Sequence, residues 1–495
     1  MPQSDHSVHL DSLEEGRLLR EFFRDSGYQA RQLTAWLGRV GPPTQHRRDL
    51  PILLHQTREP NRLNTLVRWF VIGQTVDAAA ARAVIPEAML RLFLKSGMVV
   101  ADNDSFAPAV IVLPLDDLLT VCDRAPRNDP RPDVVVGMTP SARVLTQFTI
   151  PRKVGAALDL CCGSGIHALQ LVSQCDSVAA SDLNPRALQY ARFNAQLNGV
   201  ENIELAEGDT FAPFEGRCFD LIVSNPPFFL LPSGDFLYNS NPLELDGFAE
   251  NLVRQTPRFL NEGGFFQMIF EWVEVEGQSW QQRLADWVSE SGCDVWLIKH
   301  YSQRPIDYCH ARMRTLDQVS VEHDVEMLAR WTGYFSRHKV AAMHGGMIAM
   351  RKRSGQRNWV EVEDAPFHIE SPFGDLVEAV FQAHDLVTGA GDDTLLALHP
   401  RLSPLVRLEQ VSQASPDGWS ATSVRLKLEQ GLERATKLDQ YAAAFLAECT
   451  GERSLGELIE LYLPSEGPQA EQVRAGCIAV MRQLMRRGFL LNGRA

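Results

Sequence analysis

The tetrapeptide Asn225-Pro226-Pro227-Phe228 carries groups that could act on a planar substrate with an amino group. The side-chain oxygen of Asn225 and the carbonyl oxygen of Pro226 can each accept a hydrogen bond from an NH2 group, while Phe228 packs on the flat face. The two prolines would hold these acceptors in a fixed orientation before a substrate arrives. An amide or exocyclic amino nitrogen is a weak nucleophile because its lone pair is delocalised, so acceptors aimed in this way would make it more reactive.

An apolar run, Phe219-Asp-Leu-Ile-Val-Ser224, comes directly before this tetrapeptide and predicts a buried strand. The tetrapeptide should therefore lie at the carboxyl end of a sheet strand, which is where open α/β sheets bind ligands. A segment of this kind is also a common turn, so its meaning depends on what else reaches the same edge of the sheet.

A second apolar run ends at a glycine-rich turn and predicts a strand, a turn and a helix. Residues 156–160 are followed by Gly163 and Gly165, and then by a helical run over residues 166–172. Glycines allow the backbone to approach a ligand closely, and a helix that begins after them opens with unpaired N–H groups. The turn could form a shelf for a cofactor, although a simple strand-to-helix turn has the same pattern.

An isolated acid, Asp182, follows a third apolar run at residues 178–181. It stands about twenty residues past the glycine turn, where the second strand of a doubly wound sheet should end. In related dinucleotide-binding folds, a carboxylate at this place accepts hydrogen bonds from the ribose hydroxyls. Asn184 and Pro185 already make a good start for the next helix, so Asp182 is not needed as its cap.

Taken in chain order, these segments resemble the class I S-adenosylmethionine-dependent methyltransferases, and more narrowly the branch that methylates planar nitrogens. The matching segments are Ala-Leu-Asp159-Leu-Cys-Cys-Gly163-Ser-Gly165, Ser-Asp182-Leu-Asn-Pro, Gly208-Asp209-Thr210 and Asn225-Pro-Pro-Phe. This branch, the methyltransferase small domain, includes rRNA guanine and adenine N-methyltransferases and release-factor glutamine methyltransferases. Cys161 departs from the family's acid-x-Gly-x-Gly-x-Gly order, and we therefore expect an unstrained backbone at Cys161.

The resemblance implies an α/β fold with a doubly wound, seven-stranded, Rossmann-like sheet that binds S-adenosyl-L-methionine. It implies catalytic roles for Asn225, Pro226, Pro227 and Phe228. The residues that it implies as contacts of the cofactor are Thr139, Asp159, Cys161, Gly163, Gly165, Asp182, Leu183, Asp209, Thr210 and Asn225. In the family, the acid at the place of Asp209 contacts the adenine amino group, and Thr210 and Phe211 could border the adenine; Asp209 could equally be a turn residue.

The composition is that of a soluble globular protein. The chain has 495 residues, 45% of them hydrophobic and 22% charged, which suggests two or three domains. The formal net charge of −14 argues against binding nucleic acid by bulk charge alone. Nine scattered cysteines without a Cys-x-x-Cys pair predict reduced thiols, no metal site and a cytoplasmic location. The N-terminus lacks a signal sequence, and the strongest apolar run, residues 107–115, is too short to cross a bilayer.

Three domains are expected. Residues 1–133 should contain helices followed by a strand hairpin with one strand at 106–113, an arrangement that resembles a winged helix. Residues 134–355 should form the methyltransferase domain, and residues 356–495 a hairpin around Pro416-Asp-Gly418 followed by a second winged-helix-like module. Such modules bind DNA, RNA or protein, and many only pack against the neighbouring domain.

The fifth strand is expected at residues 265–270, with Glu271 as its end. Release-factor glutamine methyltransferases carry a similar Asp-Gly pair, here Asp246-Gly, and a similar glutamate. Glu271 could therefore face the pocket.

A long insertion over roughly residues 301–345 precedes the last strand and exceeds a short hairpin connection. Its Trp331, Tyr334 and Arg337 could help to grip a substrate, or could only pack against the edge of the sheet.

Three functions remain open. The first is transfer of a methyl group from S-adenosylmethionine to an exocyclic amino nitrogen of a nucleic-acid base, in RNA rather than DNA. The second keeps the chemistry and changes the acceptor to a glutamine amide of a protein such as a release factor, which the acidic chain mildly favours. The third is a non-catalytic, cofactor-sensing binding protein in which Cys161 marks a degraded turn. The presence of Asp182, Asp209 and Asn225 favours the enzyme.

Overall fold

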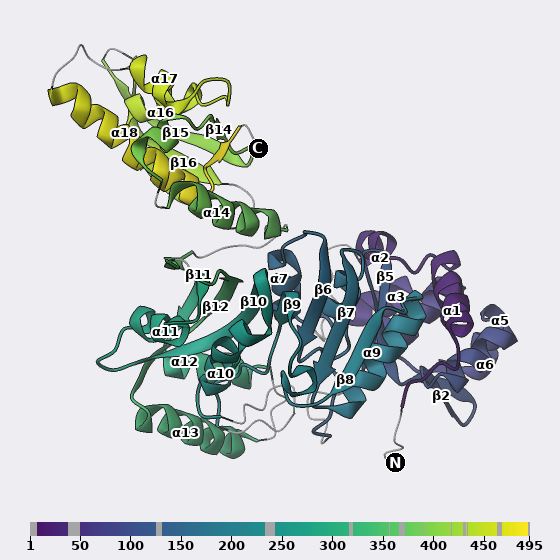
Figure 1. Cartoon of the computed structure of the whole chain (residues 1–495). Helices are drawn as coiled ribbons and strands as arrows, with labels where there is room; N and C mark the ends of the chain where they lie inside the picture. Colours follow the sequence, from purple (N-terminus) through teal and green to yellow (C-terminus); the bar gives the residue numbers. More distant parts are fainter. Residues whose placement is uncertain are drawn as a thin grey trace. The chain divides into compact units, whose positions relative to one another are not determined.

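The computed structural model divides the chain into two compact units (Figure 1). The residues that it describes are 7–37, 50–124, 131–232, 243–315, 320–355, 357–365, 372–388, 390–416, 418–428, 432, 434–462 and 468–493. The first unit comprises Met1–Leu145, Lys153–Val295 and Ser302–Val360, and the second comprises Thr146–Arg152, Trp296–Tyr301 and Glu361–Ala495. The division into three domains at residues 133 and 355 stays a prediction.

Helices come first and most of the short strands follow in the described residues up to Asp123. They are α1 (Leu13–Asp25), α2 (Ala30–Leu37), α3 (Leu50–Gln56), α4 (Arg62–Val67), the π-helix η2 (Arg68–Ile72), β1 (Val76–Asp77), α5 (Ala78–Val84), α6 (Glu87–Lys95), β2 (Val99–Asp102), β3 (Ser105–Pro108), β4 (Val110–Leu115) and β5 (Leu118–Asp123). Strands β1, β3 and β2 form an antiparallel sheet in that order, so helices precede a strand hairpin as the sequence predicted.

The single strand expected at residues 106–113 is wrong, because two strands lie there. Strand β3 ends at Pro108, which has no N–H with which to continue a ladder. The next N–H, that of Ala109, donates to the carbonyl oxygen of Met98 at 3.0 Å. Strand β4 then leaves to pair with β5 instead.

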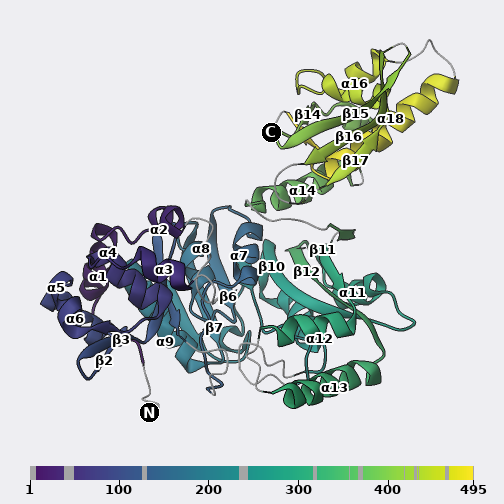
Figure 2. The same ribbon diagram turned by 180° about the vertical axis from the view of Figure 1, so that it is seen from behind.

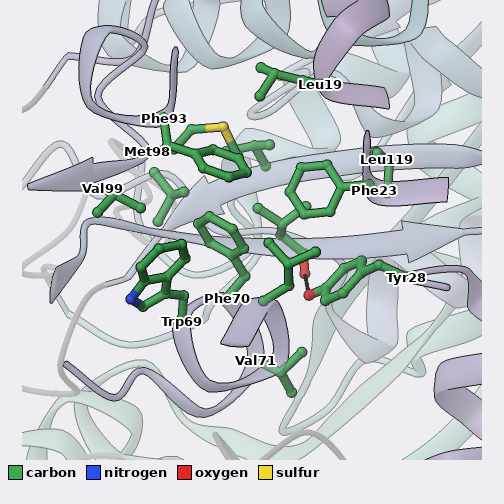
Figure 3. Packing of buried hydrophobic residues seen from close by; sticks show 14 of the residues in the cluster. Leu19, Phe23, Tyr28, Trp69, Phe70, Val71, Phe93, Met98, Val99 and Leu119 are labelled. Carbon is green, nitrogen blue, oxygen red and sulfur yellow. Dashed lines mark hydrogen bonds between the residues drawn. The ribbon is translucent and has the colours of Figure 1, made fainter. Parts of the chain in front are cut away.

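Aromatic side chains fill the core of this N-terminal module (Figure 3). The ring of Phe70 lies 5.6 Å from that of Phe23 and 5.5 Å from that of Phe93, and all three side chains are fully buried. The Tyr28 hydroxyl donates to the carbonyl oxygen of Val112 at 2.7 Å, and the Trp69 indole N–H donates to that of Phe106 at 3.1 Å. Both polar tips are therefore satisfied inside the core.

The central sheet has eight strands in the order β13-β11-β12-β10-β9-β6-β7-β8. The strands and the helices between them are α7 (Pro140–Phe148), β6 (Val154–Leu160), α8 (Ile166–Leu171), β7 (Cys175–Asp182), α9 (Pro185–Asn198), β8 (Ile203–Glu207), η3 (Ala212–Phe214), β9 (Phe219–Ser224), α10 (Gly247–Gln255), η4 (Thr256–Phe259), β10 (Leu260–Val275), α11 (Trp280–Val288), β11 (Cys293–Gln303), α12 (Pro305–Met313), α13 (Val321–Arg337), β12 (Val340–Lys352) and β13 (Val360–Asp364). The predicted α/β doubly wound sheet is confirmed, with β13 as an additional edge strand.

The strand order reverses at β6, the first strand of the sheet in the chain. Strand β6 lies between β7 and β9 and is parallel to both, and β12 is antiparallel to β10. In an open sheet, the point where the order reverses opens a crevice at the carboxyl ends of the strands. The segments after β6, β7, β8 and β9 therefore meet at the edge where a ligand would bind.

Strand β10 is longer than predicted, and Glu271 does not end it. The strand runs from Leu260 to Val275, and Glu271 is paired with Gly345 of β12 in its interior. A carboxylate is tolerated in the middle of this buried strand because Arg312 forms an ion pair with it.

Helix α9 joins the sheet to the N-terminal module, because it packs on β7 and β8 as well as on α1 and β5. A β-carbon at Gly16 of α1 would lie only 2.2 Å from the carbonyl oxygen of Gln196, so glycine alone permits this approach. The Asn194 side chain accepts the Val121 N–H at 2.8 Å and donates to the Val121 carbonyl at 2.9 Å. Asn198 makes the same two bonds to Leu119, so two amides from α9 replace a neighbouring strand for β5.

A buried ion pair lies at the same junction. Arg186 of α9 pairs with Asp123 at the end of β5, and the Tyr190 hydroxyl donates to the same carboxylate at 2.7 Å. Apolar residues of α9, including Phe193 and Leu197, belong to the core of the N-terminal module. The two regions thus share one hydrophobic core.

The second unit contains its own helices and two small sheets. Its elements are α14 (Gly374–Val387), α15 (Asp392–Leu396), β14 (Pro400–Leu402), β15 (Val406–Ser415), β16 (Gly418–Leu428), β17 (Ala435–Leu438), α16 (Gln440–Ala447), α17 (Leu455–Glu460), α18 (Pro468–Arg486) and β18 (Leu490–Asn492). The predicted hairpin is confirmed as the antiparallel pair β15 and β16, to which β17 adds, although Asp417 of its turn lies outside the described residues.

Neither a membrane span nor a metal cluster is found in the described part of the chain. No helix there is long and apolar enough to cross a membrane. No group of three or more His, Cys, Asp or Glu side chains could hold a metal ion in the same residues. Each cysteine is a free thiol.

Candidate active site

The glycine turn after β6 has a left-handed backbone at three positions. Gly163 has φ = 52° and Gly165 has φ = 77°, and Cys161 between the strand and these glycines has φ = 58°. The expectation of an unstrained backbone at Cys161 is therefore wrong. A residue with a side chain pays about 1–2 kcal/mol in this conformation, so the turn imposes the geometry of a glycine on a cysteine.

The space around this turn differs between its two glycines. A β-carbon at Gly165 would lie 2.9 Å from the Ala191 β-carbon, so this glycine lets the turn pack against α9. A β-carbon at Gly163 would meet no atom within 4 Å among the described residues. The chain is thus open above Gly163, where a ligand could approach the backbone.

Asp182 at the end of β7 ties the glycine turn to the neighbouring strand. Its carboxylate accepts the Gly163 N–H at 2.8 Å and the Asn184 N–H at 2.9 Å. Burial raises the pKa of Asp182, and these backbone hydrogen bonds act against that rise. Next to it, the Leu183 side chain is 62% exposed and adds an apolar surface to the same edge.

Asp159 at the end of β6 is fully buried. Its Oδ2 accepts the Ala168 N–H from the start of α8 at 2.9 Å, and its Oδ1 has no hydrogen-bond partner among the described residues. Burial raises the pKa of Asp159 to about 8, and the nearby charge of Asp182 adds to the rise. A cationic or hydrogen-bond-donating group of a ligand could satisfy this unpartnered oxygen.

The loop after β8 places Asp209 and Thr210 at the same edge. The carbonyl oxygen of Thr210 accepts the Ser181 hydroxyl at 3.1 Å, and Thr210 itself has φ = 47°. Phe211 does not border an open site. Its ring stacks on that of Phe259 at 4.3 Å, and its side chain is buried. Phe211 therefore belongs to the core, and only Asp209 and Thr210 remain available to a ligand.

The Asn225 segment follows β9 directly, beside β6. The Asn225 side-chain NH2 donates to the Ser141 hydroxyl at 3.4 Å, and this hydroxyl lies 2.8 Å from that of Thr139. Thr139 in turn accepts the Ala142 N–H at 3.1 Å at the start of α7. The structure therefore brings the predicted Thr139 and Asn225 together through Ser141, a residue that sequence reasoning did not single out.

The amide orientation of Asn225 matters for chemistry. Its NH2 group is engaged by Ser141, and its side-chain oxygen accepts no hydrogen bond within the described residues. Pro226 is buried, whereas Pro227 and Phe228 are half-buried. An acceptor, a rigid backbone and an aromatic face are thus available together at the carboxyl edge of the sheet.

Glu271 and Asp246 are held by the protein itself. The Glu271 carboxylate accepts the Tyr308 hydroxyl at 2.5 Å and pairs with Arg312. The Asp246 carboxylate pairs with Arg283 at 2.5 Å and accepts the Val273 N–H at 2.9 Å. These contacts engage both carboxylates within the protein itself.

The insertion contributes residues other than those expected to grip a substrate. Trp331 and Tyr334 are buried in an apolar cluster, and Arg337 is exposed. Tyr308 and Arg312 of α12 contact the segment after Phe228 instead, through Leu230 and Phe229. Their spacing of four residues places them on one helical face, but only knowledge of what α12 packs against could have identified them from the sequence.

Comparison with known proteins adds family matches. Residues 140–273 match the family model of the methyltransferase small domain, and residues 25–109 and 378–492 match two families described as domains of unknown function. The ribosomal RNA small subunit methyltransferases C of Salmonella typhi and of Salmonella agona are each 30% identical to this chain over 135 residues. That match covers 27% of this chain and 36% of each relative, so the chain spans about a third of their length.

Solved structures of methyltransferases are also similar. A ribosomal protein L11 methylase from Lactobacillus delbrueckii subsp. bulgaricus is 23% identical and covers 35% of this chain and 77% of its own, with a TM-score of 0.24. A methyltransferase from Pyrococcus furiosus is 18% identical and covers 44% and 85%, with a TM-score of 0.26.

Proposed function

Residues 140–273 form a class I, S-adenosylmethionine-dependent methyltransferase domain, and on this premise we propose that the protein methylates an exocyclic amino nitrogen of an RNA base. The observation that carries the proposal is the meeting of Gly163, Asp182 and Asn225 at the carboxyl ends of three neighbouring strands. A donor site and an acceptor site would then lie side by side.

The residues present fit this cofactor. Open space above Gly163 leaves room for a ligand against the backbone, and each Asp182 oxygen keeps a lone pair for a ribose hydroxyl. The unpartnered, buried oxygen of Asp159 suits a cationic or donating group. Leu183, exposed beside Asp182, offers an apolar surface for a flat base. Thr139, Cys161, Gly165, Asp209 and Thr210 line the same edge in this proposal.

The chain's own residues would act by positioning an amino group. S-adenosylmethionine, when bound, would supply an electrophilic methyl group and leave as S-adenosylhomocysteine, and the methylated nitrogen would release one proton to water. Asn225, with its side-chain oxygen available, and the carbonyl of Pro226 accept hydrogen bonds from the substrate NH2, which aligns its lone pair. Pro227 keeps the segment rigid and Phe228 packs on the planar face. Orientation of this kind can replace a strong base, because it removes much of the entropic barrier.

An RNA base is favoured because the similar relatives are named ribosomal RNA methyltransferases. On the N-terminal module, Lys95 of α6 pairs with Asp11 at 2.6 Å and with Glu15, and Arg82 pairs with Glu87 at 2.8 Å, so these two cations would exchange their carboxylate partners to bind phosphate. We propose a cytoplasmic location, where such a substrate would be met.

The alternative of a protein glutamine rested on Asp246, on Glu271 and on the acidic chain. Arg283 pairs with Asp246, and Tyr308 and Arg312 engage Glu271. These contacts do not favour a peptide acceptor. A cofactor-sensing protein without activity is the remaining alternative. Both are outcomes of the following test.

The test is methyl transfer from labelled S-adenosylmethionine to cell extract that has first been treated with ribonuclease, deoxyribonuclease or protease. We expect label in RNA, removed by ribonuclease and retained after protease. Label that survives both nucleases and disappears with protease would replace RNA by a protein acceptor. Cofactor binding by calorimetry without transfer to any fraction would leave only the sensing role.

A further inference from the structure

The insertion between β11 and β12 builds a second apolar core around the segment that follows the Asn225 motif. Helices α12 and α13 lie side by side and both contact β12 (Figure 2). The buried members of this core are Leu230, Val273, Tyr308, Cys309, Trp331, Tyr334, Phe335, Val340 and Met343. Leu230 stands only two residues beyond Phe228, so the insertion reaches the acceptor side of the site.

Two tyrosine hydroxyls of the insertion each accept a backbone N–H from the connection between β9 and α10. The Leu230 N–H donates to the Tyr308 hydroxyl of α12 at 3.1 Å, and the Leu245 N–H donates to the Tyr334 hydroxyl of α13 at 3.0 Å. Residues 233–242 between them lie outside the described residues. Each insertion helix thus fixes one end of the same connection.

The Tyr308 hydroxyl belongs to a buried network. It donates to Glu271 Oε2 at 2.5 Å while it accepts from Leu230, and Arg312 pairs with the other oxygen of the same carboxylate. Glu271 is only 3% exposed. A buried carboxylate needs both of these partners, because an incomplete network leaves a charge without compensation.

The network also holds an aromatic ring of the acceptor segment. The Arg312 guanidinium carbon lies 4.0 Å from the centre of the Phe229 ring, a cation–π contact. Phe229 in turn meets Phe228 edge to face at 5.7 Å.

Burial raises the pKa of the Tyr308 phenol, so the hydroxyl keeps its proton and its two hydrogen bonds over the physiological range.

We infer that Tyr308, Glu271 and Arg312 are positioning residues that set the place of Asn225–Phe228 relative to the bound acceptor. They fix Phe229 and Leu230, and the rigid prolines transmit that position to the Pro226 carbonyl and to the Phe228 ring. The insertion is thereby a determinant of acceptor alignment. This inference rests on the proposed methyl transfer.

The first variant is Tyr308→Phe, which removes one hydroxyl and keeps the ring. The Leu230 N–H then loses its acceptor, and amide exchange in a peptide covering residues 225–232 should become at least about tenfold faster. In the same protein kcat should fall roughly 10- to 100-fold, as for a displacement of about 1 Å at a reacting group. The affinity for S-adenosylhomocysteine, measured by calorimetry, should stay within about threefold, because Asp182 and Gly163 are untouched.

The matched control is Arg304→Gln. Arg304 stands at the start of α12 and pairs with Asp307 at 2.6 Å on the surface, so this variant alters an ion pair of the same helix without touching the network. It should leave exchange, kcat and cofactor affinity as in the unmodified protein. Arg312→Lys is the second test, since it keeps the charge beside Glu271 and loses the planar contact with Phe229.

Unchanged exchange and unchanged kcat in Tyr308→Phe would overturn the inference. So would equal losses of kcat and cofactor affinity, which indicate general destabilisation. If Tyr308→Phe does not fold, Arg312→Lys decides in the same way, with a smaller fall in kcat expected. A protein without any methyl transfer would refute the proposed function, whereas the exchange result would still decide whether Tyr308 holds the segment.

Discussion

The two halves of the carboxyl edge are built in different ways. On the side proposed to bind the cofactor, Asp182 accepts a backbone N–H 19 residues away and Asp159 accepts one that is 9 residues away. On the acceptor side, Tyr308 binds Leu230 across 78 residues and Tyr334 binds Leu245 across 89. The first half is made from short strand–turn–helix units, and the second depends on a remote insertion. A change in one half should therefore leave the other half's function intact.

Asn225→Ala should give the largest effect and tests this separation most directly. Loss of the side-chain acceptor should lower kcat roughly 100- to 1,000-fold, as removal of one aimed hydrogen-bonding group does in other enzymes. Cofactor affinity by calorimetry should stay within about threefold. Asn251→Ala, at an exposed position of α10, is the control and should be neutral. Full turnover in Asn225→Ala would remove the role assigned to this residue.

Asp182→Asn should produce the opposite pattern. The carboxylate accepts two backbone N–H groups, and an amide NH2 would face one of them, so the turn around Gly163 should loosen. The dissociation constant for S-adenosylhomocysteine should rise about tenfold or more, equivalent to about 1.4 kcal/mol. The value of kcat at saturating cofactor should change less than the affinity. A fall in kcat with unchanged affinity would break the division between the halves.

Asp159→Asn should change how stability depends on pH. The pKa of Asp159 is raised to about 8 in the folded protein, against about 3.9 in an unfolded chain. Between these values the folded state binds more protons than the unfolded state, so stability falls as pH rises through this window. The contribution is on the order of a few kcal/mol. The side-chain amide of the Asp159→Asn variant cannot ionise. The urea midpoint of this variant should therefore fall less between about pH 5 and pH 8 than that of the unmodified protein. An identical slope in both proteins would argue against a raised pKa.

Cys161→Gly should have the smallest effect. Glycine removes the left-handed strain of about 1–2 kcal/mol and adds about 0.5–1 kcal/mol of chain entropy cost, so the free energy of unfolding should rise by about 1.5 kcal/mol at most. Cys161→Ala, which keeps the β-carbon, should show no such gain. Cofactor affinity should change less than about threefold in both variants. A large loss of affinity in Cys161→Gly would assign the thiol a direct role.

The cofactor half was predictable because its signals are local. Gly163, Asp182 and the start of α9 at Asn184 each stand at a fixed distance from an apolar run, and the structure confirms the strand, the turn and the helix cap. The cap is explicit, since Asn184 accepts the Arg186 N–H at 3.0 Å. The left-handed conformation of Cys161 was missed, because a residue type alone does not reveal the φ angle that a turn imposes.

The acceptor half was predictable only in part. The tetrapeptide at Asn225 is recognisable in the sequence. Nothing in the sequence near Ser141, Tyr308 or Arg312 links these residues to it. Glu271 was mistaken for the end of a strand, because a charged residue in an apolar run usually marks a boundary. Its partner Arg312 stands 41 residues away, and the ion pair makes an interior position possible.

The core that the N-terminal module shares with α9 constrains the order in which the chain can fold. Its members extend from Val8 to Leu197, so this core cannot be completed during synthesis until β7 and α9 have followed the N-terminal module. Until then, the apolar side chains of the N-terminal module stay exposed to water. We therefore expect the central sheet and the N-terminal module to unfold in one cooperative transition.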